Sequence, residues 1–213
     1  MLAKTSTVTV SVAAGSRRES PANAGVTGIL NHMSFNGTTD RTSLAITRES
    51  ERDGTSLSSV AGKETVTYSA TFLADNLETA VFNLSDAVTG QEFNTWEVAD
   101  AKADAKTVAL SGADAVVDAL HAGAFRNTLG RSEVTPAYKV AGISAETLAA
   151  FTAANFTGGN ISVIGAGVDH GALVELVADN FPVDAGEDLP AGASTYYGGA
   201  ETRIEANTGN VTF

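Results

Sequence analysis

Few side chains in this sequence have the chemistry of a catalytic or metal site. There is no cysteine, which excludes thiol catalysis, thiolate metal ligands and a disulfide framework. The three histidines, His32, His121 and His170, lie far apart in the sequence, whereas a catalytic zinc ion normally needs three protein ligands and a water. His121 and His170 have no partner at ligand spacing. Each is more typical of a packed or hydrogen-bonded core residue than of a ligand.

Three carboxylates, Glu97, Asp100 and Asp104, lie three and four residues apart and would share one face of a helix. Such a face could bind a divalent ion through oxygen ligands. Lys102 and Lys106 are interleaved with the acids, and this mixture favours a solvated helix surface.

A second weak signal is the pair Gly165 and Gly167, which follows an apolar run as in a dinucleotide-binding loop. The third glycine and the later acidic residue of that motif are missing. The pattern therefore favours a simple turn between a strand and a helix.

The composition narrows the possible partners. The 213 residues include 25 acidic and only 13 basic side chains, giving a net charge of -12. Nucleic-acid binding is excluded because it needs clustered Lys and Arg to neutralise phosphates. No apolar run approaches the roughly 20 residues that a membrane-spanning helix needs, so no direct membrane span is expected. The first nine residues lack the character of a transit peptide or a secretory signal.

Hydrophobic periodicity predicts the elements that must position these side chains. Alternation predicts strands over 7–12, 56–60 and 64–72, the last two joined as a hairpin at Gly62 and Lys63, and a buried run predicts a strand over 161–164. Helical spacing predicts helices over 24–35, 41–53, 76–90, 93–108, 116–125, 148–156 and 171–181. Ser144 and Asp169 are expected N-terminal caps, as is either Asp75 or Asn76, and Gly54 and Gly90 are expected helix ends.

The sum is an α+β fold: a mixed, mostly antiparallel sheet with helices packed on one face, forming a single domain over residues 1–213.

Residues 15–38, with the sequence GSRRESPANAGVTGILNHMSFNGT, resemble the active-site segment of the pitrilysin-type zinc peptidases, which include mitochondrial processing peptidase. In that family a strand ends in Gly-Ser-Arg, and a helix beginning at Gly-Val carries H-x-x-E-H. Two histidines four residues apart bind zinc from one helix face, and the glutamate activates a water. Phe, a variable residue, Gly and Thr follow, as they do here.

The resemblance keeps the framework of this site and loses its chemistry. The first ligand position is Gly28, the general-base position is Asn31, and only His32 retains the family residue. The third-ligand region of the family aligns with Glu97 and Asp104. His32 and Asp104 would supply two ligands where three are needed, and an amide at Asn31 takes up no proton near neutral pH. We therefore expect no catalytic residue, no bound metal and no cofactor.

Two further stretches, Trp96–Asp100 and Leu120–Asn127, resemble the core protein 2 branch of this family, as does the region from Ile143 to Phe181. That branch belongs to the mitochondrial cytochrome bc1 complex. The resemblance implies a non-catalytic structural subunit, peripheral on the matrix side of the inner membrane and bound to a second core subunit and other subunits of the complex. A non-catalytic partner of a processing peptidase that binds presequences is the alternative, and an independent zinc hydrolase is disfavoured.

Family members contain two homologous halves, and this chain corresponds to the first half without its usual first strand. We expect such a sheet to expose an unpaired edge and an uncovered face. This predicts an obligate hetero-oligomer.

Overall fold

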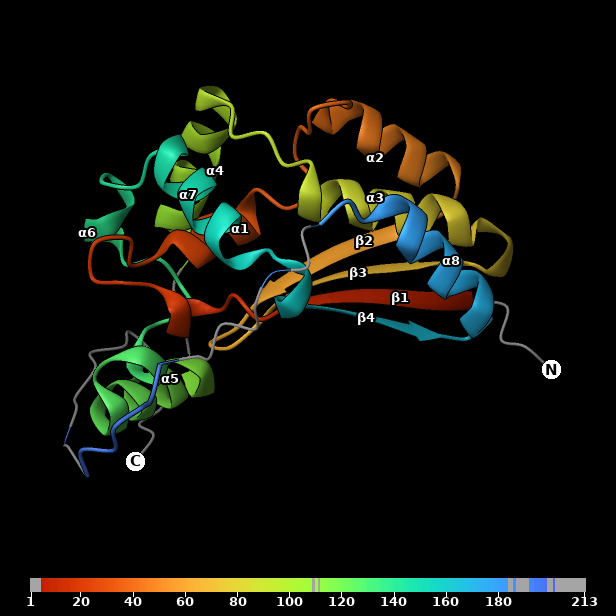
Figure 1. The fold of residues 1–213 in the computed structure, drawn as a ribbon. Helices are drawn as coiled ribbons and strands as arrows, with labels where there is room; N and C mark the ends of the chain where they lie inside the picture. Colours follow the sequence, from red (N-terminus) through yellow and green to blue (C-terminus); the bar gives the residue numbers. More distant parts are fainter. Residues whose placement is uncertain are drawn as a thin grey trace.

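The computed structural model describes residues 5–183 apart from 109 and 111, together with 186, 192–198 and 201. Its centre is a four-stranded antiparallel sheet formed by β1 (Thr5–Val12), β2 (Ser56–Ala61), β3 (Val66–Leu73) and β4 (Ile161–Ala166). The strand order is β2-β3-β1-β4. β1 is therefore central although it comes first in the chain, and β2 and β4 are the two edges (Figure 1).

Helices cover one face of this sheet (Figure 1). They are α1 (Val26–His32), α2 (Ser43–Arg52), α3 (Leu77–Thr89), α4 (Thr95–Thr107), α6 (Ala137–Val140), α7 (Ala145–Asn155) and α8 (His170–Asn180). Short 3-10 turns are η1 (Ser16–Arg18), η2 (Ala74–Asn76), η3 (Thr128–Gly130) and η4 (Gly158–Asn160). The α+β class predicted from the sequence is confirmed.

One helix departs from this layer. α5 (Gly112–Phe125) packs on η3 and lies beyond the end of the sheet, below the other helices in Figure 1. Val117 and Leu120 on α5 are largely exposed. The helical periodicity predicted α5, but its apolar side chains do not contribute to the main core.

The core lies between the sheet and the helices because the two central strands, β1 and β3, alternate buried and outward side chains. Tyr68 and Phe72 of β3 are among the largest fully buried side chains. Ile29 of α1, Leu84 of α3 and Leu148 of α7 belong to the same buried cluster and come from the helical layer. Burial raises the pKa of the Tyr68 phenol to about 12, because the anion would lose its hydration there.

The other face of the sheet carries mainly hydroxyl groups. Thr7 and Thr71 approach to 3.2 Å across β1 and β3, and Thr9 and Ser69 approach to 3.0 Å. An uncovered face was predicted, and these hydroxyl side chains are compatible with water. The expectation of a partner therefore rests on the sheet edge and not on this face.

Most predicted element boundaries hold within two residues, and some details are corrected. The hairpin between β2 and β3 has a four-residue loop closed by Gly62 N donating to Thr65 O at 2.8 Å, so β3 begins later than predicted. Ser144 and Asp169 cap α7 and α8 as predicted. Asn76 does not cap α3 with its side chain, because its amide donates to Asp53 O at 2.7 Å.

A buried polar network joins the loop after α1 to α2 and α3. Arg41 donates to Asp86 Oδ2 at 2.6 and 2.8 Å, to Asn83 Oδ1 at 2.7 Å and to Glu49 Oε2 at 2.8 Å. Thr38 donates to the same Asp86 oxygen at 2.9 Å. The network fixes the loop that follows the candidate site.

Among the residues that the structure describes, no helix combines the length and apolar character needed to cross a membrane.

Candidate functional site

The helix that carries the family motif, α1, begins at an anchored turn. Gly25 has φ 93°, a left-handed conformation that favours glycine. Glu19 accepts hydrogen bonds from Gly25 N at 2.8 Å and Thr27 N at 2.9 Å, so its carboxylate satisfies amides that the first helical turn leaves free. Burial raises the pKa of Glu19, and these hydrogen bonds oppose the shift without cancelling it.

Position 28, the first ligand position of the family, has no space for a side chain. Gly28 is buried, and a Cβ there would lie 2.9 Å from Thr135 N and 3.3 Å from Glu133 O. The Thr135 hydroxyl would lie closer still, inside the 3.0 Å that real Cβ contacts respect. Thr135 is 3% exposed and donates to Gly25 O at 2.7 Å, so the obstacle is held in place.

The next two positions of the motif, Asn31 and His32, are half-buried on the last turn of α1. Asn31 Oδ1 is shielded from solvent and accepts no hydrogen bond within the described residues. Its backbone carbonyl lies 3.4 Å from the hydroxyl of Ser59 on edge strand β2. The structure therefore places an amide, which is not a base, beside the edge of the sheet.

The carboxylates of the predicted third-ligand region lie on α4. Glu97 Oε1 accepts from Gly37 N at 3.0 Å, so this carboxylate holds the loop after α1. Asp100 and Asp104 are exposed on α4, as expected for a solvated surface. Across residues 5–183 and the other described positions, no three His, Cys, Asp or Glu side chains gather as metal ligands would. The residues present thus do not fit the zinc ion that the family motif implies.

The weaker candidates also find structural explanations. His121 Nδ1 lies 2.8 Å from Val117 O, so His121 is hydrogen-bonded within α5 as predicted, but it is half-buried outside the main core. His170 is exposed at the start of α8, so the expectation of a core residue is wrong there. Gly167, at φ 75°, lies in the predicted turn between β4 and α8, whereas Gly165 is still within β4 and pairs with Val8 of β1.

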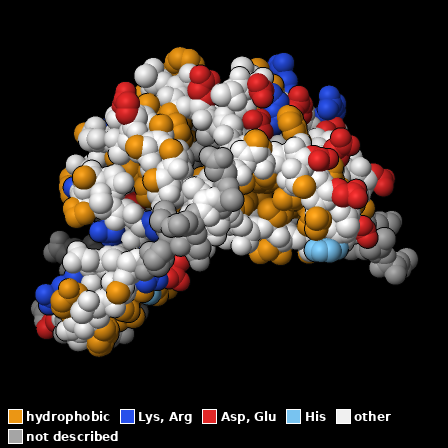
Figure 2. Space-filling view, in the orientation of Figure 1, with side chains coloured by type: hydrophobic (Ala, Val, Ile, Leu, Met, Phe, Trp, Pro, Cys, Tyr) orange, Lys and Arg blue, Asp and Glu red, His pale blue; other side chains and the backbone are white. Residues whose placement is uncertain are grey.

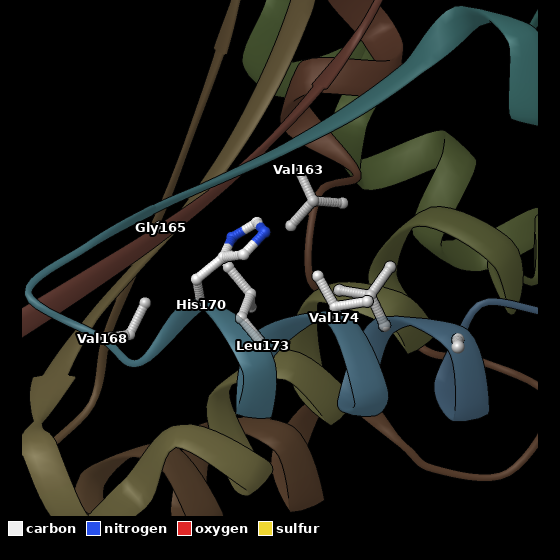
Figure 3. A pocket seen from close by; sticks show the side chains of 8 residues that line it. Val163, Gly165, Val168, His170, Leu173 and Val174 are labelled. Atoms are coloured by element: carbon white, nitrogen blue, oxygen red, sulfur yellow. The ribbon is translucent and has the colours of Figure 1, made fainter.

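An apolar groove at the free edge of the sheet was not predicted. It lies between β4 and α8, has a volume of about 410 Å³, and is lined by Val163, Leu173, Val174 and Val177 with His170 at its rim. Figure 3 shows Val163 facing Leu173 and Val174 across this space. A second apolar hollow adjoins it, and Figure 2 shows hydrophobic side chains gathered below α8. Residues 161–164 were predicted as a buried run, but no residue of β4 is buried, so the prediction of burial was wrong and did not indicate this groove.

This arrangement of a degenerate H-x-x-E-H helix over an antiparallel sheet defines the class of protein. Residues 2–137 match the family described as Insulinase (Peptidase family M16), and the chain belongs to that family. Human cytochrome b-c1 complex subunit 2, mitochondrial, is 33% identical over 196 residues, which are 90% of this chain and 43% of that protein. The mouse subunit of the same name is 31% identical over 204 residues, covering 94% of this chain and 45% of the relative.

The similarity extends to a second kind of subunit. The mitochondrial-processing peptidase subunit beta of Blastocladiella emersonii is 33% identical over 183 residues, covering 83% of this chain and 39% of that protein. The chain therefore spans less than half the length of the relatives it matches. The family match and these identities confirm the predicted resemblance to pitrilysin-type peptidases and to core protein 2.

Sequence reasoning missed Thr135, although it found Gly28. The two residues are 107 positions apart in the printed sequence, and nothing in the local pattern around Thr135 indicates contact with α1. A glycine at a ligand position was the one available signal, and it was interpreted as a lost ligand instead of a close approach.

Proposed function

We propose that this chain is a non-catalytic structural core subunit of the mitochondrial cytochrome bc1 complex. In this proposal it is a single pitrilysin-like domain, peripheral on the matrix side of the inner membrane, and it supports assembly without a cofactor of its own. The observation that carries the proposal is the state of α1: Gly28 is packed against Thr135 and Asn31 replaces the general base. Such a helix neither binds a catalytic zinc ion nor activates a water.

The similarity to cytochrome b-c1 complex subunit 2 of human and mouse over at least nine-tenths of this chain supports the choice of complex. It also supports a second core subunit and other subunits of the complex as partners, in an obligate hetero-oligomer. The apolar groove beside β4 gives a physical reason for association. Among the described residues, β4 hydrogen-bonds to β1 on one side only. Burial of apolar surface and of free strand edges favours a covering subunit.

The alternative is a non-catalytic partner subunit of a mitochondrial processing peptidase that binds presequences. The similarity to the processing peptidase beta subunit of Blastocladiella emersonii favours it. The net charge of -12 would attract a basic presequence, but it does not separate the two proposals. Both proposals keep the chain non-catalytic and differ in the assembly that it joins.

Purification from native membranes after mild detergent extraction separates the two assemblies. The bc1 proposal predicts that a tag on the full chain recovers haem absorbance with it. Presequence cleavage without haem in the same material favours the processing peptidase. Metal analysis of the purified chain tests what both share, since stoichiometric zinc together with peptide turnover by the isolated chain would contradict either.

The groove gives a matched pair of variants for the association. Val174→Asp places a charge on a groove residue that is 52% exposed, and Leu44→Asp does the same on α2, away from the groove, at 57% exposure. Both variants should fold, because both sites face solvent. Loss of co-purification with Val174→Asp alone is expected. Equal recovery of partners with both variants, or a monodisperse monomer of the wild type at micromolar concentration in light scattering, would count against association through this edge.

A further inference from the structure

We infer that the segment 133–136 closes the metal-ligand face of α1 by packing, so that restoring the family residues on α1 cannot reopen a metal site. This goes beyond the proposed function, because it holds whichever assembly the chain joins. In this inference, the contact between Gly28 and Thr135 holds α1 to the rest of the molecule at the position where the family has a metal ligand.

Two glycines one helical turn apart form the notch that receives Thr135. A Cβ at Gly25 would lie 2.6 Å from Thr135 Cγ2 and 3.4 Å from Pro136 Cδ, and one at Gly28 would meet the hydroxyl and amide of Thr135. The threonine therefore sits directly on the backbone of α1. Part of the obstacle at position 28 is main chain, Thr135 N and Glu133 O, which no rotamer change removes.

The segment that supplies Thr135 is itself anchored. Just before it, Arg131 donates to the carbonyls of Arg17 and Glu19, and its own carbonyl accepts from Lys63 Nζ at 2.8 Å. Thr135 adds the bond to Gly25 O. These contacts hold the segment to η1, to the residue after η1 and to the hairpin loop, so moving it away from α1 would strain several hydrogen bonds at once.

The contact reverses the usual effect of a glycine-to-alanine change. In the open interior of a helix, alanine is more stabilising than glycine. At position 28 the added methyl group overpacks a filled site, and we expect Gly28→Ala to lower the midpoint of thermal unfolding by roughly 4–10 °C. Gly142→Ala is the matched control. Its Cβ would meet no atom nearer than Lys139 O at 3.7 Å, so its midpoint should stay unchanged or rise.

A double-substitution cycle assigns the cause. Thr135→Ala removes the nearest obstacle, so Gly28→Ala should cost at most half as much in that background as in the wild type. Equal costs in both backgrounds, or a higher midpoint for Gly28→Ala alone, would overturn the inference.

A second test concerns metal binding. It combines Gly28→His with Asn31→Glu, and these changes together with His32 restore the H-x-x-E-H motif on α1. We expect a lowered midpoint that added zinc does not restore. A midpoint equal to that of the wild type, or a zinc-dependent rise of 5 °C or more, roughly the shift from binding worth 1–2 kcal/mol, would show that the site is open and overturn the closure. Zinc in the wild type would instead contradict the proposed function, so the two failures are distinguishable.

Discussion

Removing the guanidinium of Arg41 should be among the most destabilising single changes in the chain. Arg41 binds Asp86 with two nitrogens, and the exposed fractions of the two side chains are 11% and 8%. Its guanidinium also lies 4.6 Å from the ring centroid of Phe82, which shields it from water. In Arg41→Ala the Asp86 carboxylate stays buried with Thr38 as its remaining hydrogen-bond donor among the contacts described above.

The magnitude follows from that uncompensated charge. Removing one partner of a buried ion pair costs about 3–5 kcal/mol, far more than the pair itself contributes over an apolar replacement. The Glu49 contact adds little because that carboxylate is 37% exposed. The cation–π contact with Phe82 adds roughly 0.5–1 kcal/mol. We expect a loss of about 3–5 kcal/mol, a large part of the roughly 5–15 kcal/mol that stabilises a typical domain.

Urea denaturation followed by circular dichroism measures this loss as a fall in midpoint at constant slope. Arg52→Ala is the control, because Arg52 pairs with Asp53 on the surface with 72% of its side chain exposed. Its denaturation midpoint should not change measurably. The double variant Arg41→Met/Asp86→Leu removes both charges and should be more stable than Arg41→Ala. A loss below about 1 kcal/mol for Arg41→Ala, or a double variant weaker than the single one, would refute the reasoning.

Three further predictions concern ionisation and helix capping. The fold raises the pKa of Tyr68 to about 12. The free energy of unfolding of the wild type should therefore fall by about 2–3 kcal/mol relative to that of Tyr68→Phe as pH rises from about 10 to about 12. An equal dependence on pH in the two proteins would contradict this. Because the pKa of Glu19 is raised, the folded state keeps this carboxyl protonated to a higher pH than the unfolded state does. The free energy of unfolding of the wild type relative to Glu19→Gln should therefore fall as pH rises above the usual range of a glutamic acid. An increase over that range would contradict the prediction. Asp169→Ala removes the N-cap of α8, which accepts from Ala172 N at 3.0 Å, and should cost about 1 kcal/mol in urea denaturation, with Asp169→Asn recovering most of it.

The sheet and most helices could be predicted because their signals are local. Alternation over 7–12 fixed the buried face of β1, and the capping residues Ser144 and Asp169 located the starts of α7 and α8. The strand order could not be derived this way, since placing β1 between β3 and β4 depends on pairings across more than 50 residues. The position of α5 also escaped prediction, because periodicity shows that a helix has an apolar face without showing what covers it.

The same difference between local signals and long-range contacts applies to the candidate site. The chemical losses at Gly28 and Asn31 are visible in the sequence because the resemblance supplies the expected residues. The role of Glu97 is not, since its hydrogen bond to Gly37 N depends on how the loop after α1 meets α4. A carboxylate aligned with the metal-ligand region of the family is therefore a loop anchor here.

The packing at Gly28 changes what the degenerate motif means. A chain that had only lost a ligand would keep an empty place for it, and a single substitution could restore the donor atom. Here the place is filled by the hydroxyl and main chain of Thr135, and the same contact ties α1 to a segment that Arg131 fastens to the carbonyls of Arg17 and Glu19. Restoring a ligand at position 28 would need changes both on α1 and on the segment that carries Thr135. We expect either change alone to destabilise the fold. Because the two segments depend on each other, the packing at Gly28 favours retention of α1 as a fixed part of the fold.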